Sequence, residues 1–191
     1  PAAGLTQQLP HEMQIRAGYG RTLSRPDFRE LSPATFNDVT GGRQTYGNPE
    51  LQRALIDNAD LRWEWFFGPG EVLGLGAFAK WFHDPIEQIV IVSAQHSVTY
   101  ENADGATDLG VELDGKVFLD FLLDDRAFLA GNIALIQSRV DLGDSGGIES
   151  SKERALQGQS PYVVNLQLGW EDVERGSRAM LVYNVSGKRI T

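Results

Sequence analysis

One short segment of the chain has the residue types of a nucleophilic active site. Ser145 follows an aspartate and is flanked by glycines in the run Gly-Asp-Ser-Gly-Gly at 143–147, and His96 precedes it. A serine nucleophile needs a histidine as base, a carboxylate that orients this base, and backbone amides that bind an oxyanion. The segment is therefore the first candidate for enzymatic chemistry.

Segment 143–147 matches the nucleophile loop of trypsin-like serine proteases, but its context differs. Ile148 stands where that family has proline, and the chain has no cysteine for the family's disulfides. Too few residues separate His96 from Ser145 to build the barrel that lies between these groups in that fold. Because serine, aspartate and glycine are common loop formers, we interpret the segment as a loop and predict no catalytic residue and no enzyme.

The remaining composition excludes several other functions. No histidine has a second histidine at ligand spacing, and no calcium-binding ladder accompanies the acidic pairs, so we predict neither a metal nor a cofactor. A net charge of -9 argues against a nucleic-acid partner, which would need a basic surface. No run of about 18 apolar residues is present to form a membrane helix, although a transmembrane barrel needs none.

Alternation of apolar and polar residues is the dominant pattern. In 109–121 the apolar parity holds Leu109, Val111, Leu113, Val117, Leu119 and Phe121, and most charges occupy the other parity. A strand places such charges on one face, whereas a helix would scatter them. The same pattern predicts about seven strands, which are roughly 9 to 15 residues long and exceed the usual soluble strand of about 5 to 6.

The connections between these strands alternate in length. Short turns are predicted at 68–70, 124–126 and 172–176, and long connections at 24–56, 83–106 and 142–160. Short turns at one end and long loops at the other are typical of outer-membrane barrels. Aromatic residues near the strand ends, such as Trp65 and Trp170, fit an interfacial girdle. The alternative is a soluble β-sandwich that binds a ligand, because a sandwich alternates equally well.

A series of short segments resembles the barrel of TonB-dependent outer-membrane receptors of Gram-negative bacteria. The segments follow the family's order along nearly the whole chain, and they lie at 19–33, 47–51, 57–66, 78–80, 84–87, 110–113, 158–162 and 183–190. The resemblance implies an antiparallel up-and-down barrel of about 22 strands with a plugged lumen, of which this chain holds about a third. We therefore expect 1–191 to be one partial barrel domain, without the plug and the final strands.

The resemblance also implies a function. Such receptors import a scarce nutrient (an iron chelate, cobalamin or an oligosaccharide) across the outer membrane, and TonB energises them through the plug. The expected partners are the nutrient, outer-membrane lipid, the receptor's own plug and TonB. Charges on the inward parity are interpreted mainly as a solvated surface whose members pair across neighbouring strands; the alternative is that some hold the plug or line a substrate path. Ligand contacts are expected from cationic and aromatic residues of the long connections: Arg25, Arg29, Arg43, Tyr46, Tyr100 and Arg154.

Overall fold

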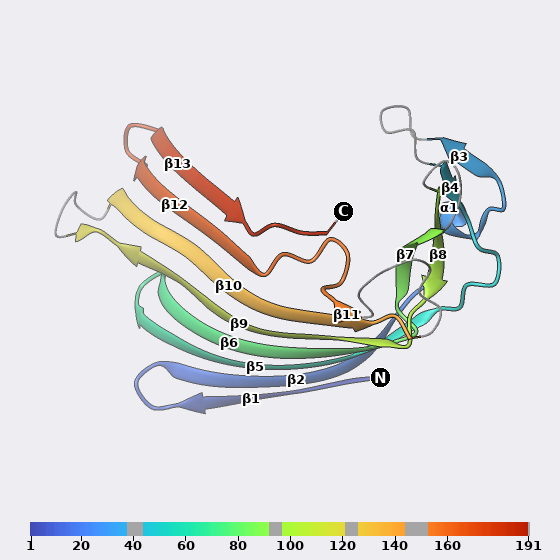
Figure 1. Ribbon diagram of the computed structural model, residues 1–191. Helices are drawn as coiled ribbons and strands as arrows, with labels where there is room; N and C mark the ends of the chain where they lie inside the picture. Colours follow the sequence, from blue (N-terminus) through green and yellow to red (C-terminus); the bar gives the residue numbers. More distant parts are fainter. Residues whose placement is uncertain (38–43, 92–96, 121–125, 144–152, 191) are drawn as a thin grey trace.

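Eight long strands form one antiparallel sheet, here called the wall, in the computed structural model, which describes residues 1–37, 44–91, 97–120, 126–143 and 153–190. Their order is β1-β2-β5-β6-β9-β10-β12-β13, and the sheet curves into a trough (Figure 1). Their bounds are β1 Ala2–Leu9, β2 Met13–Ser24, β5 Ala54–Gly68, β6 Glu71–His83, β9 Gly105–Phe118, β10 Ala127–Asp141, β12 Tyr162–Asp172 and β13 Ser177–Ser186. The two-residue β11 (Glu153–Arg154) pairs with the end of β10.

The predicted all-β, antiparallel up-and-down arrangement is confirmed. Each long strand pairs with its predecessor and successor among the long strands, and the sheet is open at β1 and β13 within this chain. Strand β1 adds to the predicted set, because its sequence AAGLTQQL has little contrast between the two parities. It is nevertheless paired with β2 along its full length, from Ala2 opposite Gly20 to Leu9 opposite Met13.

Short and long connections lie at opposite ends of the wall, as predicted. The turn between β5 and β6 contains Gly70 at φ 79°, and the turn between β12 and β13 ends at Gly176 at φ 62°, a backbone region that favours glycine. The predicted turn at Asp124-Asp125 lies outside the described residues. Figure 1 shows the short turns together at the left and the long connections at the right.

The two faces of the wall differ at every second residue. On the apolar parity, here called the outward face, Leu109, Val111 and Leu113 are 47%, 49% and 45% exposed. In the described part of the chain no second sheet packs against this parity, so the structure does not support a soluble sandwich. A two-sheet sandwich would cover such side chains with its other sheet.

Polar residues mark one boundary of the apolar belt on the outward face. Near the long-connection end, Arg21 makes two hydrogen bonds to Asp57, at 2.7 Å from Nε and 2.6 Å from Nη2. His83 Nε2 lies 3.0 Å from the same carboxylate. From this cluster toward the short turns, β5 presents Leu61 and Trp65 on the outward face.

The first two long connections fold together into a second, four-stranded sheet. It consists of β3 (Thr35–Asn37), β4 (Gln44–Tyr46), β8 (Ser97–Asn102) and β7 (Ile86–Ile91), in that order, and it lies at the right in Figure 1. Asp27 caps the N-terminus of the helix α1 (Phe28–Leu31) and forms a capping box with Glu30. No helix of the described chain is long and apolar enough to cross a membrane.

Candidate functional site

The face of the wall opposite the outward face is here called the luminal face. Two adjoining hollows, here called the vestibule, open on this face where the wall meets the second sheet. Their volumes are about 470 and 410 Å³, and both are lined by Glu30, Ile86, Glu87 and Gln157. The vestibule is thus built by three connections that are far apart in sequence. A cavity of this size with converging polar groups is a typical small-molecule site.

The structure brings three of the six predicted ligand-contact residues to the vestibule or its edge. Arg25 follows β2 and lines the larger hollow, and Tyr100 on β8 lines the smaller one. Arg154 on β11 binds Glu87 of β7 across a distance of 2.7 Å, with the Arg154 and Glu87 side chains only 13% and 5% exposed. Arg154 therefore fixes β7 at the edge of the vestibule, and its guanidinium is engaged by Glu87.

The other predicted residues lie elsewhere. Arg29 on α1 places its guanidinium 4.9 Å from the centre of the Phe36 ring. Tyr46 on β4 donates its hydroxyl hydrogen bond to Gln44 at 2.7 Å. Neither side chain lines either hollow. Arg43 lies outside the described residues, as do His96 and Ser145 of the segment considered above for nucleophilic chemistry.

A buried carboxylate in the larger hollow was not predicted from the sequence. Asp108 on β9 is 5% exposed, and its Oδ1 receives no hydrogen bond from the described part of the chain. Its cross-strand neighbour Lys80 lines the same hollow and places its ammonium 5.8 Å from the centre of the Phe78 ring. Inward parity near the beginning of β9, at the end of a long connection, was the signal that could have identified Asp108.

The charge of the vestibule is mixed. The larger hollow combines Arg25 and Lys80 with four carboxylates, those of Asp27, Glu30, Glu87 and Asp108. In the second sheet, Glu101 lies directly opposite Glu87, and burial raises the pKa of the Glu101 carboxyl. Such a surface can offer hydrogen bonds of both kinds to a polar ligand. Among the described residues, no group of three histidines or carboxylates is placed to hold a metal ion.

Several luminal charges are paired midway along the wall. Arg62 on β5 makes two hydrogen bonds to Asp114 on β9, at 2.6 and 2.8 Å, and one to Glu64 at 2.9 Å. Arg16 on β2 adds a bond of 2.7 Å to Glu64, so four charges form one network. Arg62 reaches β9 across β6 because Gly74 leaves room, since a Cβ there would meet Arg62. The expectation of cross-strand pairing on the inward parity is confirmed for these residues.

Comparison with known proteins gives the family of this chain. The family model described as "TonB dependent receptor-like, beta-barrel" matches residues 1–190. The chain belongs to the TonB-dependent receptor β-barrel family. It is therefore part of an outer-membrane barrel, and the prediction that it is not an enzyme is confirmed, because these receptors transport rather than catalyse.

Individual relatives agree with the family. The iron-regulated outer membrane virulence protein of Vibrio cholerae serotype O1 is 24% identical over 168 residues, which cover 84% of this chain and 24% of the relative. The siderophore receptor PirA of Pseudomonas aeruginosa superimposes with a TM-score of 0.69 at 19% identity, over 98% of this chain and 33% of PirA. A mutant of the ferric enterobactin receptor PfeA from the same species superimposes with a TM-score of 0.64 at 19% identity. The match covers 99% of this chain and 28% of PfeA. The chain thus spans about a quarter of its curated relative.

Proposed function

We propose that this chain supplies wall and three extracellular connections to a receptor that imports a ferric chelate across the outer membrane. The family supports outer-membrane uptake, and an iron-regulated protein and two receptors of iron chelates are among the relatives. Nothing in the comparisons favours cobalamin or an oligosaccharide as the ligand. The observation on which the proposal rests is the family match over 1–190, together with a polar vestibule at the long-connection end of the wall.

The rest of the receptor follows as part of this proposal. The wall closes with further strands into a barrel of about 22, because an open edge exposes unpaired backbone groups that hydrocarbon cannot satisfy. A plug fills the lumen against the Arg16, Glu64, Arg62 and Asp114 network, and TonB acts through that plug. Arg25 and Tyr100 contact the ligand by charge and by ring contact, whereas Arg154 positions the vestibule. For Arg29, Arg43 and Tyr46, a ligand contact stays a prediction.

Uptake by cells that express the full receptor tests the imported class. Under iron restriction, cells should take up radiolabelled iron from a ferric catecholate or hydroxamate chelate, and a TonB-deficient strain should not. Uptake of labelled cobalamin or a maltooligosaccharide by the same receptor, without iron uptake, would contradict the proposal.

A matched pair of arginines in the first connection tests the vestibule. Arg25 lines the larger hollow, whereas Arg29 lies over Phe36. Loss of one charged hydrogen bond costs about 1.5–3 kcal/mol, so Arg25→Ala should raise the Kd of the chelate roughly tenfold or more. Arg29→Ala should raise the Kd less than Arg25→Ala, because Arg29 lines neither hollow. Equal effects of both variants would remove the vestibule from the binding site.

A further inference from the structure

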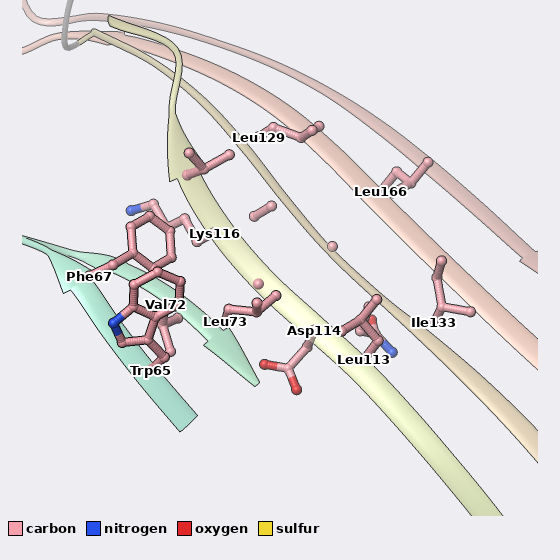
Figure 2. A pocket seen from close by; sticks show the side chains of 15 residues that line it. Trp65, Phe67, Val72, Leu73, Leu113, Asp114, Lys116, Leu129, Ile133 and Leu166 are labelled. Atoms are coloured by element: carbon pink, nitrogen blue, oxygen red, sulfur yellow. The ribbon is translucent and has the colours of Figure 1, made fainter. Parts of the chain in front are cut away.

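The outward face contains a groove among the apolar side chains of the belt. Its volume is about 500 Å³, within the range of about 300–1,000 Å³ for small-molecule sites. Figure 2 shows Trp65, Phe67 and Leu73 on one side and Leu129, Ile133 and Leu166 on the other. Trp65, Leu129, Ile133 and Leu166 are between 37% and 42% exposed, so the rim consists of large side chains that project from the wall.

Two glycines on neighbouring strands create the floor of this groove. Gly115 on β9 and Gly131 on β10 are cross-strand partners on the outward parity. A Cβ at Gly131 would lie 2.7 Å from the Asn165 carbonyl oxygen, and one at Gly115 would lie 3.0 Å from that of Val72. Backbone atoms thus leave little room for a side chain at either position. The floor of the groove therefore carries no side chain at these two positions, and the Leu166 side chain also limits the space at Gly131.

The polar residues at the groove direct their polar atoms to the luminal face. Asp114 binds Arg62 there, and Asn132 accepts a hydrogen bond from Asn165 at 2.9 Å. Lys116 places its ammonium 4.8 and 4.7 Å from the ring centres of Phe118 and Phe128. The groove itself therefore offers hydrocarbon contacts and almost no hydrogen bonds.

Position and direction argue for one kind of occupant. The groove continues the apolar belt, which faces the hydrocarbon of the outer membrane in a barrel of this family. It lies in the short-turn half of the wall, since Trp65 stands three positions before the last residue of β5 and Val72 is the second residue of β6. Short turns of outer-membrane barrels face the periplasm, and their strands tilt by about 35–45°. A groove across tilted strands is inclined to the membrane plane, a direction that an acyl chain can follow.

We propose that this groove binds one acyl chain of a phospholipid from the periplasmic leaflet. The chain packs over Gly115 and Gly131 between the two rims, and the indole of Trp65 lies beside it near the interfacial region, where tryptophan is favoured. This site is independent of the imported nutrient, so it stands or falls separately from the proposed function.

Fluorescence of the full receptor in detergent micelles that contain no other phospholipid tests the site. Two variants retain one tryptophan each, Trp65 at the groove or Trp63 one outward position away, which does not line it. Phospholipid with brominated acyl chains is added at increasing mole fraction. A bound chain should quench Trp65 strongly at low mole fraction with saturation, whereas Trp63 should follow the mole fraction linearly. Linear quenching of both would overturn the proposal.

A second pair of variants controls for general effects on the belt. Leu129→Phe narrows the groove, and Leu135→Phe adds the same group to the same face of β10 outside it. Only Leu129→Phe should abolish the excess quenching of Trp65. If lipopolysaccharide but not phospholipid competed with the brominated chain, the occupant would be an outer-leaflet lipid and the proposal would fail. A receptor dimer in native mass spectrometry that Leu129→Phe dissociates would instead assign the groove to a second copy.

Discussion

The two faces of the wall are made by the same strands, yet they hold different chemistry one residue apart. On β9, Leu113 projects from the outward face among exposed apolar side chains, whereas Asp114 binds Arg62 on the luminal face at 2.6 Å. Outward side chains need no partner when their solvent is hydrocarbon. Several luminal charges, those of Arg16, Arg62, Glu64 and Asp114, are paired across strands. The difference shows why apolar and polar residues alternate in this sequence: one face of each strand contacts hydrocarbon and the other contacts water.

Introducing a charge on the outward parity should have the largest effect on the stability of the receptor. Leu113→Arg places a guanidinium in hydrocarbon near the middle of the belt, with an expected loss of stability of roughly 2–4 kcal/mol. Glu112→Arg, one residue away on the exposed luminal face, should cost much less. Denaturant unfolding of the full receptor in lipid vesicles measures both. Similar losses for the two variants would show that the faces do not have different solvents.

Breaking the luminal network should have the next largest effect. Glu64 is 6% exposed and accepts hydrogen bonds from Arg16, Arg62 and Gln14. Glu64→Ala leaves two guanidinium groups without this partner, and we expect a loss of about 1.5–3 kcal/mol. Glu112→Ala removes an exposed carboxylate from the same face and serves as the control. A Glu64→Ala receptor as stable as the control would show that the network is not needed to hold the wall.

The alternation predicted the wall well because the outward face of each strand contacts hydrocarbon. Every second residue is therefore apolar. The alternation identified most strands, two of the three described short turns and the long connections. It missed β1, whose parities hardly differ, and with it the turn between β1 and β2. The second sheet could not be predicted, because β4 and β8 are short and belong to different connections. β4 and β8 pair at Thr45 and Val98. This contact depends on the positions of the strands that the two connections join, β2 and β5 for the first and β6 and β9 for the second.

The vestibule was harder to predict for the same reason. Sequence could select loop residues by type, and Arg25 and Tyr100 do line it. It could not show that Arg154 is bound to Glu87, since the two residues meet only through the third connection folding back over the wall. Likewise, Asp108 follows the inward parity of a strand, and only the packing of the connections buries it.

Loosening the vestibule should have a smaller, local effect. Arg154→Ala removes the ion pair with Glu87 and the hydrogen bond to the Ala155 carbonyl, with an expected local cost of about 1–2 kcal/mol. Hydrogen exchange of the β7 amides in the full receptor should become faster, while β9 and β10 remain protected. Arg29→Ala is the control. Unchanged exchange in β7 would mean that Arg154 does not position this strand.

The polar boundary of the outward face should show the smallest effect. The Arg21 side chain is 46% exposed, and Asp57 keeps contacts with Tyr19 and His83 when Arg21 is removed. Exposed ion pairs contribute below about 1 kcal/mol, so Arg21→Ala should hardly change the unfolding of the full receptor. A loss as large as that of Leu113→Arg would place this cluster inside the hydrocarbon, against the boundary described here.

Accessibility of the two ends of the wall tests most directly that this chain crosses the outer membrane. Because the chain has no cysteine, single cysteines can be placed at Glu50 and Lys188, exposed at the long-connection end, and at Pro69 and Glu174 in the short turns. In intact cells that express the full receptor, an impermeant thiol reagent should label the first two positions. The last two should react only after the outer membrane is permeabilised. Labelling of all four positions in intact cells, or of the short turns alone, would contradict the account.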